Sequence, residues 1–311
     1  MKLTLAAITL IGTLIGAWTL QPELIGVEIL SELPNPKPTA HIPYGDDPLQ
    51  FGDLRLPPGA GPHPVVVVIH GGCWRAQYNI DHIGAFSDAL TKAGVATWAV
   101  EYRRVGNPGG GWPGTFQDIA AAVDHLRNVA NEHPIDLERV VAVGHSAGGH
   151  LVLWLGAREK IADVTLRGDD PLPLKGVVSL AGVDDLRRAL DEGICDEMAA
   201  ELIGGTPDDV PERYAIGSPI ELLLTGLTGL TGLTGLTGLT GPTGVPQHLI
   251  NGARDPIVPE AFGHAYKAAA ERVGEPVELT VLPDAGHFEL IVPTTNAWAT
   301  VRDAIVEMLE R

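Results

Sequence analysis

The sequence predicts an α/β fold in which a mostly parallel central sheet is covered by helices on both faces. Short apolar runs alternate along the chain with amphipathic stretches of helical period, which is typical of consecutive strand–helix–strand units. The 311 residues are also 45% hydrophobic, so the chain has enough apolar surface for a sizeable core. Because large α/β folds often exceed roughly 200 residues as one unit, we expect one large domain with appendages.

The expected strands are six short, mostly apolar runs that fit strands buried on both faces. They are Val65–Ile69, Val95–Val100, Val140–Val143, Gly176–Leu180, Pro246–Ile250 and Val277–Leu282. The expected helices are Ile83–Ala93, Thr115–Ala130, Ala147–Glu159, Glu260–Val273 and Ala297–Glu310. Residues 184–224 break the alternation and predict a lid. Function in such sheets lies at the carboxyl ends of the strands.

Residues 3–20 contain no charged side chain and are rich in Leu, Ile, Ala and Thr. The run is long for a signal peptide and just long enough to cross a membrane, so residues 1–22 are a signal peptide or a membrane anchor. A hydrophobic helix docked on the core is the alternative. Prolines 34, 36 and 38 predict a linker over residues 23–38, before a domain at 39–311. We expect export, with the domain secreted, periplasmic or membrane-anchored outside the cytoplasm.

A low-complexity insert occupies residues 224–244, where six Leu-Thr-Gly triplets precede Pro-Thr-Gly. Its three-residue period fits neither a helix nor a strand, and the tract is too short and too poor in proline for a collagen helix. Surface insertions are tolerated because closure entropy grows only logarithmically with loop length. We assign the insert no chemistry.

The composition argues against several classes of function. The chain has 39 acidic and 21 basic residues, a net charge of -18, whereas nucleic acids and anionic membranes are bound by Lys and Arg. Two cysteines cannot form a four-cysteine zinc site, and no His-Glu-x-x-His or dinucleotide fingerprint occurs. We expect no nucleic-acid partner, no metal and no organic cofactor. The oligomeric state stays open.

The pentapeptide Gly144-His145-Ser146-Ala147-Gly148 directly follows an apolar run and precedes a helical pattern. In that context Gly-x-Ser-x-Gly is typical of a tight turn that lifts a nucleophilic serine above a sheet. Glycines are needed where the neighbouring chain passes close. We predict that Ser146 is a nucleophile, and a purely structural turn is the alternative.

A serine nucleophile needs a histidine base and a carboxylate that orients the histidine. Asp255 and His287 each lie in a loop just after a predicted strand. The order Ser146, Asp255, His287 is the one expected of a sheet with such a turn. Asp184 and Asp185 also follow a strand end and are the second candidates for the acid.

The loop His70-Gly71-Gly72-Cys73-Trp74 follows the first apolar run. Glycines leave backbone N–H groups uncovered, and such groups stabilise the negative charge of an acyl-transfer transition state. We expect the amides of Gly72 and Cys73, together with that of Ala147, to form an oxyanion hole. Trp74 is expected to line the substrate pocket or to belong to the core. A phosphate-binding loop is excluded because no Gly-Lys-Ser/Thr follows.

Together, His-Gly-Gly-x-Trp at 70–74, Gly-His-Ser-Ala-Gly-Gly at 144–149, Asp255 and His287 resemble the α/β-hydrolase superfamily, specifically its esterase and kynurenine-formamidase-like members. The resemblance covers about residues 39–311. It implies the α/β-hydrolase fold, a triad of the motif serine, aspartate and histidine, and an oxyanion hole from the His-Gly-Gly loop. Cys73 replaces the third glycine of hormone-sensitive-lipase-like esterases, which favours the formamidase-like branch.

Cys73 lies in the predicted oxyanion loop and Cys195 in the predicted lid. In an oxidising compartment they would form a disulfide that ties the lid to the rim of the site, and two independent thiols are the alternative. At the end of another predicted strand, Arg103 is expected to join a buried structural network or to brace the oxyanion loop.

These residues predict a serine hydrolase that cleaves a small carboxylic ester or aryl N-formyl amide through an acyl-enzyme. A prolyl-oligopeptidase-like peptidase is one alternative, because it uses the same triad order. A catalytically silent hydrolase fold that serves as a binding module is the other, since fold does not imply function. The identity of the small-molecule substrate depends on pocket walls that are distant in sequence.

Overall fold

The computed structural model describes residues 22–228 and 243–311. All but the last residue of the expected signal peptide or anchor at 1–22, and most of the insert at 224–244, lie outside these residues. No helix of the two described ranges is both long enough and apolar enough to cross a membrane.

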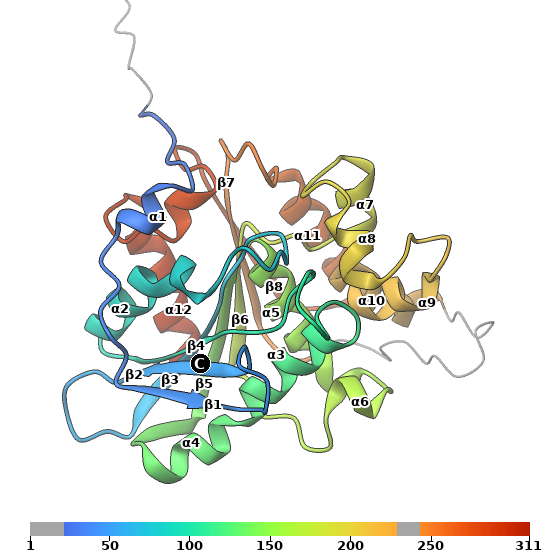
Figure 1. Ribbon diagram of the computed structural model, residues 1–311. Helices are drawn as coiled ribbons and strands as arrows, with labels where there is room; N and C mark the ends of the chain where they lie inside the picture. The colour runs from blue at the N-terminus through green and yellow to red at the C-terminus, as the bar shows by residue number, and fades with distance from the viewer. Residues whose placement is uncertain (1–21, 229–242) are drawn as a thin grey trace, which may run out of the picture.

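The strands of the described residues form one eight-stranded sheet in the order β1-β2-β4-β3-β5-β6-β7-β8 (Figure 1). The strands β3 to β8 pair in parallel, whereas β1 and β2 join one edge in antiparallel orientation. Their bounds are β1 Ala40–Pro43, β2 Phe51–Arg55, β3 His63–Ile69, β4 Ala96–Val100, β5 Ile135–His145, β6 Gly176–Leu180, β7 Gln247–Gly252 and β8 Val277–Leu282. All six predicted strands are present, and β1 and β2 are additional.

Helices cover both faces of the sheet, as predicted. Alternate side chains of β3 explain this, because Val65 and Val67 enter one apolar cluster while Val66 and Val68 enter another. The first cluster is closed by α3 Gly114–Asp124, α5 Ala147–Ala157 and α11 Ala261–Val273, and the second by α2 Gly84–Lys92 and α12 Ala297–Glu310. The short helices are α1 Ile29–Glu32, η1 Ile80–Ile83, α4 Leu126–Glu132, η2 Arg158–Lys160, α6 Val164–Arg167 and η3 Phe288–Leu290.

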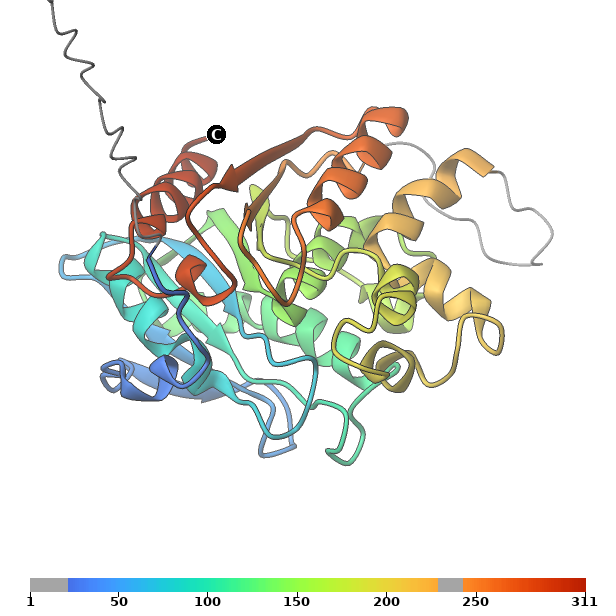
Figure 2. The same cartoon turned by 90° about the horizontal axis from the view of Figure 1, so that it is seen from above.

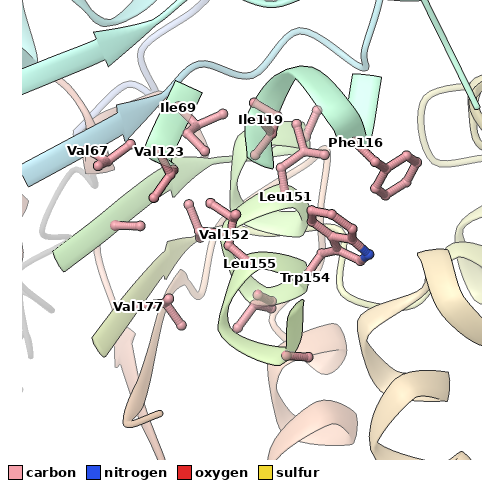
Figure 3. Close-up of a cluster of buried hydrophobic side chains, with 14 of the residues drawn as sticks. Val67, Ile69, Phe116, Ile119, Val123, Leu151, Val152, Trp154, Leu155 and Val177 are labelled. Atoms are coloured by element: carbon pink, nitrogen blue, oxygen red, sulfur yellow. The ribbon is translucent and has the colours of Figure 1, made fainter. Parts of the chain in front are cut away.

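The central helix α5 is buried along its whole length. Leu151 and Val152 pack with strand residues such as Val67 and Val177 (Figure 3). On another side, the ring of Trp154 meets that of Phe116 of α3 edge-on at 5.1 Å (Figure 3). Since α5 begins directly after Ser146, this packing fixes the position of the predicted nucleophile.

Four helices between β6 and β7 occupy the predicted lid: α7 Leu186–Asp191, α8 Met198–Ile203, α9 Pro211–Gly217 and α10 Pro219–Thr228. The first residues of the insert continue α10 to Thr228, although the triplet period predicts no helix. Near the carboxyl end of the insert, Thr243 donates two hydrogen bonds to the carboxylate of Glu275, one from its backbone N–H and one from its hydroxyl.

Residues 23–38, expected as a linker, lie against the domain. The helix α1 packs on η1, and the side chain of Asn35 bonds both Asp81 and Arg55. In Figures 1 and 2 this blue stretch runs beside the red carboxyl-terminal part of the chain. These contacts join the stretch to the predicted catalytic domain.

Candidate active site

Ser146 lies at a sharp turn between β5 and α5, with φ 56° and ψ −118°. A Cβ atom on Gly144 would lie 2.1 Å from the carbonyl oxygen of Gly148, and one on Gly148 would lie 2.2 Å from that of Ile69. Both positions therefore admit only glycine. A non-glycine residue with positive φ costs free energy, and such strain is typical of a nucleophile held at a strand-to-helix turn.

Asp255 and His287 form a buried pair. The Nδ1–H of His287 donates to Asp255 Oδ2 over 2.7 Å, and the two side chains are 4% and 0% exposed. The other carboxylate oxygen accepts the backbone N–H groups of Ile257 at 2.7 Å and Val258 at 2.9 Å. With the proton on Nδ1, His287 Nε2 is free to act as a base.

His145 ties the turn at Ser146 to the loop of His287. Its Nε2–H donates to the backbone carbonyl of His287 over 3.1 Å, so its Nδ1 accepts from His82 Nε2–H at 3.2 Å. Burial, followed by the charges of His287 and His82, lowers the pKa of His145 well below its usual value. Burial also lowers the pKa of His82 to about 3. Both rings are neutral at neutral pH, and their hydrogen bonds link His82, the turn at Ser146 and the loop of His287.

Ser146 and His287 follow the carboxyl ends of β5 and β8, which point the same way in the sheet. Among the described residues, no hydrogen bond joins Ser146 Oγ to His287 Nε2. In free enzymes such bonds are often long, and they tighten when substrate binds. The structure thus shows the predicted base, His287, oriented by Asp255.

The predicted oxyanion loop passes directly over the turn at Ser146. A Cβ atom on Gly71 would lie 2.7 Å from the carbonyl oxygen of His145 and 3.0 Å from Ser146 Cβ. Gly72 has φ 104°, which favours glycine. Within the described part of the chain, the N–H groups of Gly72, Cys73 and Ala147 donate no hydrogen bond. These three amides are available to a ligand.

A buried ionic network holds the start of the oxyanion loop. The ring of His70 bonds the carbonyl of Gly71 at 2.8 Å and lies 3.1 Å from a carboxylate oxygen of Glu101, which also pairs with Arg104. Burial alone would raise the pKa of Glu101, but His70, Arg104 and the amide of Ile80 outweigh burial and hold it below the usual value.

Arg103, expected to join a buried structural network or to brace the oxyanion loop, takes the first role, in an ion pair with the buried Asp118 that is separate from the pair of Glu101 and Arg104. Its guanidinium bonds both carboxylate oxygens of Asp118, at 2.8 Å and 2.6 Å. Arg104 makes the pair with Glu101 instead, because adjacent side chains at a strand end point in opposite directions.

Cys73 and Cys195 are joined by a disulfide, with 5.6 Å between their Cα atoms. Beside it, Arg75 Nη2 donates to Asp196 Oδ2 over 2.6 Å. The oxyanion loop is thus tied to the segment between α7 and α8.

Trp74 has no exposed surface and belongs to the main apolar cluster. Its ring meets that of His150 edge-on at 5.2 Å, and His150 Nε2–H donates to the carbonyl of Gly217 in the lid. Trp74 is therefore a core residue and not a wall of the substrate pocket.

In the described residues, the other candidates for the acid make no hydrogen bond or ion pair with His287. Asp184 is buried, its Oδ1 has no partner in the described residues, and burial raises its pKa well above the usual value. Asp185 caps α7 through the N–H of Arg188. Within the same residues, no group of three or more His, Cys, Asp or Glu side chains could hold a metal ion.

Sequence reasoning missed two residues near the site. His82 contacts His145 from 63 positions away, and no sequence pattern links the two. Glu289, two residues after His287, is only 8% exposed. Its position in the otherwise apolar stretch 288–292 indicates burial, and a buried carboxylate needs hydrogen-bond donors.

Comparison with known proteins assigns the family. The BD-FAE family model matches residues 53–226, more than half of the chain, including the oxyanion loop and Ser146. The chain belongs to the BD-FAE family. Asp255 and His287 of this BD-FAE member lie beyond the matched range, so their assignment depends on the geometry above.

Curated relatives of this BD-FAE member are hydrolases by name. It is 25% identical over 257 residues to Esterase LipC of Mycobacterium tuberculosis (strain ATCC 25618 / H37Rv), covering 80% of this chain and 59% of LipC. It is 28% identical over 154 residues to the kynurenine formamidase of Meyerozyma guilliermondii, covering 49% of this chain and 55% of that protein. The chain thus spans less than two thirds of the length of these relatives.

A solved structure of similar fold is a truncated carbohydrate esterase from gut microbiota, with a TM-score of 0.72 and 21% identity. The match covers 90% of this chain and 99% of that chain. At this identity the similarity shows the fold alone. The predicted α/β-hydrolase fold is confirmed.

Proposed function

We propose that this BD-FAE member is a serine hydrolase that cleaves a small carboxylic ester through an acyl-enzyme on Ser146. The observation that carries the proposal is the buried pair of His287 and Asp255 at the sheet edge where the strained turn presents Ser146. A purely structural turn needs neither the strain nor an oriented histidine beside it. The esterase names of the relatives support the same reaction class.

In the first half-reaction, Ser146 Oγ attacks the ester carbonyl carbon and its proton passes to His287 Nε2. Asp255 stabilises the imidazolium that forms. The C–O bond to the leaving group then breaks, and His287 returns the proton to the leaving alcohol. An acyl group stays on Ser146.

In the second half-reaction, water attacks the acyl carbon while His287 accepts its proton. The bond to Ser146 Oγ breaks, the serine is reprotonated by His287, and a carboxylic acid leaves. In both halves the free N–H groups of Gly72, Cys73 and Ala147 are the proposed donors to the negatively charged oxygen.

An aryl N-formyl amide is the second candidate substrate. The specific support is the similarity to a kynurenine formamidase over about half of the chain. The chemistry is the same, except that the amide nitrogen leaves and takes the proton from His287.

The test is hydrolysis of p-nitrophenyl acetate, p-nitrophenyl octanoate and N-formylkynurenine by the full chain and by Ser146→Ala. We expect turnover that disappears in the variant, and the preferred compound chooses between ester and formamide. A fluorophosphonate label should attach to the full chain and not to Ser146→Ala. If both proteins are inactive on all three compounds and take up no label, the binding-module alternative replaces the hydrolase.

We also propose that the domain works outside the cytoplasm. The support is the Cys73–Cys195 disulfide, because disulfides persist mainly in oxidising compartments. Cell fractionation followed by thiol counting on denatured, non-reduced protein tests this. Recovery of the protein in the cytosol with two free thiols would contradict it.

A further inference from the structure

The residues Pro22–Ile25, which we call the strap, lie against the two loops that carry Asp255 and His287. The N–H of Ile25 donates to Glu289 Oε1 over 2.7 Å, and the Nη1 of Arg254 donates to the carbonyl of Pro22 over 2.9 Å. Figure 2 shows the blue start of the described chain passing beside the red loop region. Each contact reaches a residue within two positions of a member of the acid–base pair.

The carboxylate of Glu289 joins the strap to the base loop. One oxygen accepts the N–H of Ile25 and the other accepts the N–H of Gly286 over 3.0 Å. The backbone carbonyl of Glu289 also accepts the hydroxyl of Thr295 at 2.7 Å. Because the side chain is 8% exposed, water competes little for these bonds. Glu289 therefore fixes the backbone on both sides of His287.

Arg254 joins the strap to the acid loop. Its backbone N–H donates to the carbonyl of Ala285 over 3.0 Å, so the acid and base loops are bonded directly. A Cβ atom on Gly252 would lie 2.4 Å from the same carbonyl oxygen. The loops approach too closely for any residue but glycine at that position, and a shift of one moves the other.

Apolar contacts complete the docking. A Cβ atom on Gly286 would lie 3.0 Å from Leu24 Cδ2, so the strap covers the base loop in close contact. Ile25 packs against the apolar cluster that contains Phe288 and Leu290. The strap thus has apolar contacts with residues on both sides of His287 in sequence.

We propose that the strap, through Glu289, is a positioning element that holds His287 and Asp255 in register for catalysis. The proposal rests on the proposed serine-hydrolase function. Glu289 touches no reacting atom and acts only through the backbone of the base loop. Removal of its contacts should lower kcat while KM stays unchanged, because substrate binding does not depend on the alignment of the base.

The first test variant is Glu289→Gln in the full chain. A glutamine has a carbonyl oxygen in place of one carboxylate oxygen and an NH₂ group in place of the other. The N–H of Ile25 or that of Gly286 therefore loses its acceptor and faces the NH₂ group. A displacement of the base by about 1 Å costs roughly a hundredfold in rate, so we expect a kcat tenfold to about a hundredfold lower for p-nitrophenyl acetate. Glu23→Gln is the matched control, since this exposed carboxylate of the strap makes no hydrogen bond in the described residues.

The second variant is Ile25→Pro, which deletes the N–H donor and leaves Glu289 intact. Both variants are also compared with wild type by hydrogen exchange of the peptide 282–292. We expect faster exchange in this peptide and unchanged exchange in β3, residues 63–69, which reports the core. If exchange in β3 is also faster in Glu289→Gln, that variant has lost its fold. The kcat and the hydrogen exchange of Ile25→Pro then test the proposal.

Wild-type kcat together with wild-type exchange at 282–292 in either folded variant would overturn the proposal. Exchange does not require turnover, so it tests the strap even if the full chain proves to hydrolyse nothing. The strap and the hydrolase function can therefore fail separately.

Discussion

The two loops on either side of Ser146 are held by different kinds of interaction. The oxyanion loop is fixed by the Cys73–Cys195 disulfide and by a buried ion pair between Glu101 and Arg104. The base loop is fixed by hydrogen bonds to His287 and its neighbours. Oxyanion donors must stand ready before the reaction, whereas the base must gain and lose a proton while its ring stays oriented. Damage to the crosslink and ion pair of the first loop should therefore lower stability as well as rate, whereas damage to the second loop should lower mainly the rate.

The largest effect is expected from Asp255→Asn on the base side. The variant no longer stabilises the imidazolium and holds the wrong tautomer, so kcat should fall by about 10³ to 10⁴. Steady-state hydrolysis of p-nitrophenyl acetate measures this, and the free energy of unfolding should change little. Asp284→Asn, an exposed carboxylate nearby, is the control. A loss below tenfold would place the acid elsewhere.

On the oxyanion side, Glu101→Gln should act first on stability. Arg104 is 2% exposed and would lose its counter-charge, which costs about 3–5 kcal/mol of unfolding free energy. Urea unfolding measures the loss, with the exposed Glu159→Gln as the control. Equal midpoints for the two variants would show that the pair contributes nothing.

The double variant Cys73→Ser with Cys195→Ser sharpens the comparison further. Opening a crosslink between residues 122 positions apart should lower the unfolding free energy by about 2–4 kcal/mol. A reductant should lower the Tm of the wild type and leave the Tm of the double variant unchanged. A reductant effect of equal size in both proteins would argue against the disulfide as its source.

The smallest effect is a pH dependence from His150, which supports Trp74 beneath the oxyanion loop. Burial lowers its pKa to about 4, whereas the unfolded value is about 6.5. Above pH 6.5 the ring is neutral in both states. As pH falls from 6.5 toward 4, the unfolded chain binds a proton that the folded protein does not, so stability decreases by about 1.4 kcal/mol per pH unit.

His150→Gln removes this titration. Between pH 7 and pH 5 the wild type should lose about 2 kcal/mol more unfolding free energy than the variant. Urea unfolding at several pH values makes the measurement. Parallel curves for the two proteins would show that His150 titrates normally in the folded state.

The alternation of apolar runs and amphipathic stretches was sufficient to predict the six parallel strands and the helices that cover the two faces of the sheet. Runs such as Val65–Ile69 are apolar on both faces because they are buried on both faces. The antiparallel strands β1 and β2 were missed, and the edge strand β1 is explained by its alternation between half-buried and exposed residues and by Pro43, which is typical of a loop. The helix pattern at 115–130 was predicted as one element, but α3 ends at Asp124 and α4 begins at Leu126.

At the site, motif context and strand-end position were enough to select Ser146, Asp255 and His287 as candidates. The hydrogen bonds that support these residues were not predictable, because contacts such as His82 with His145 and Ile25 with Glu289 depend on tertiary placement alone. The two neighbouring arginines are a further example, because it is Arg104, and not Arg103, that pairs with Glu101 beside the oxyanion loop. Sequence indicates which residues stand at a strand end but not which way each side chain turns.

The hydrogen bonds from Thr243 to Glu275 fix the chain at the carboxyl end of the Leu-Thr-Gly insert. The chain returns from the Leu-Thr-Gly insert at the amino end of β7, and Asp255 follows the carboxyl end, about 20 Å away along six residues. A change of one triplet would alter the length between two fixed points, α10 and Thr243, without moving the acid loop. Any change in the length of the insert is thereby separated from the residues on which the proposed reaction depends.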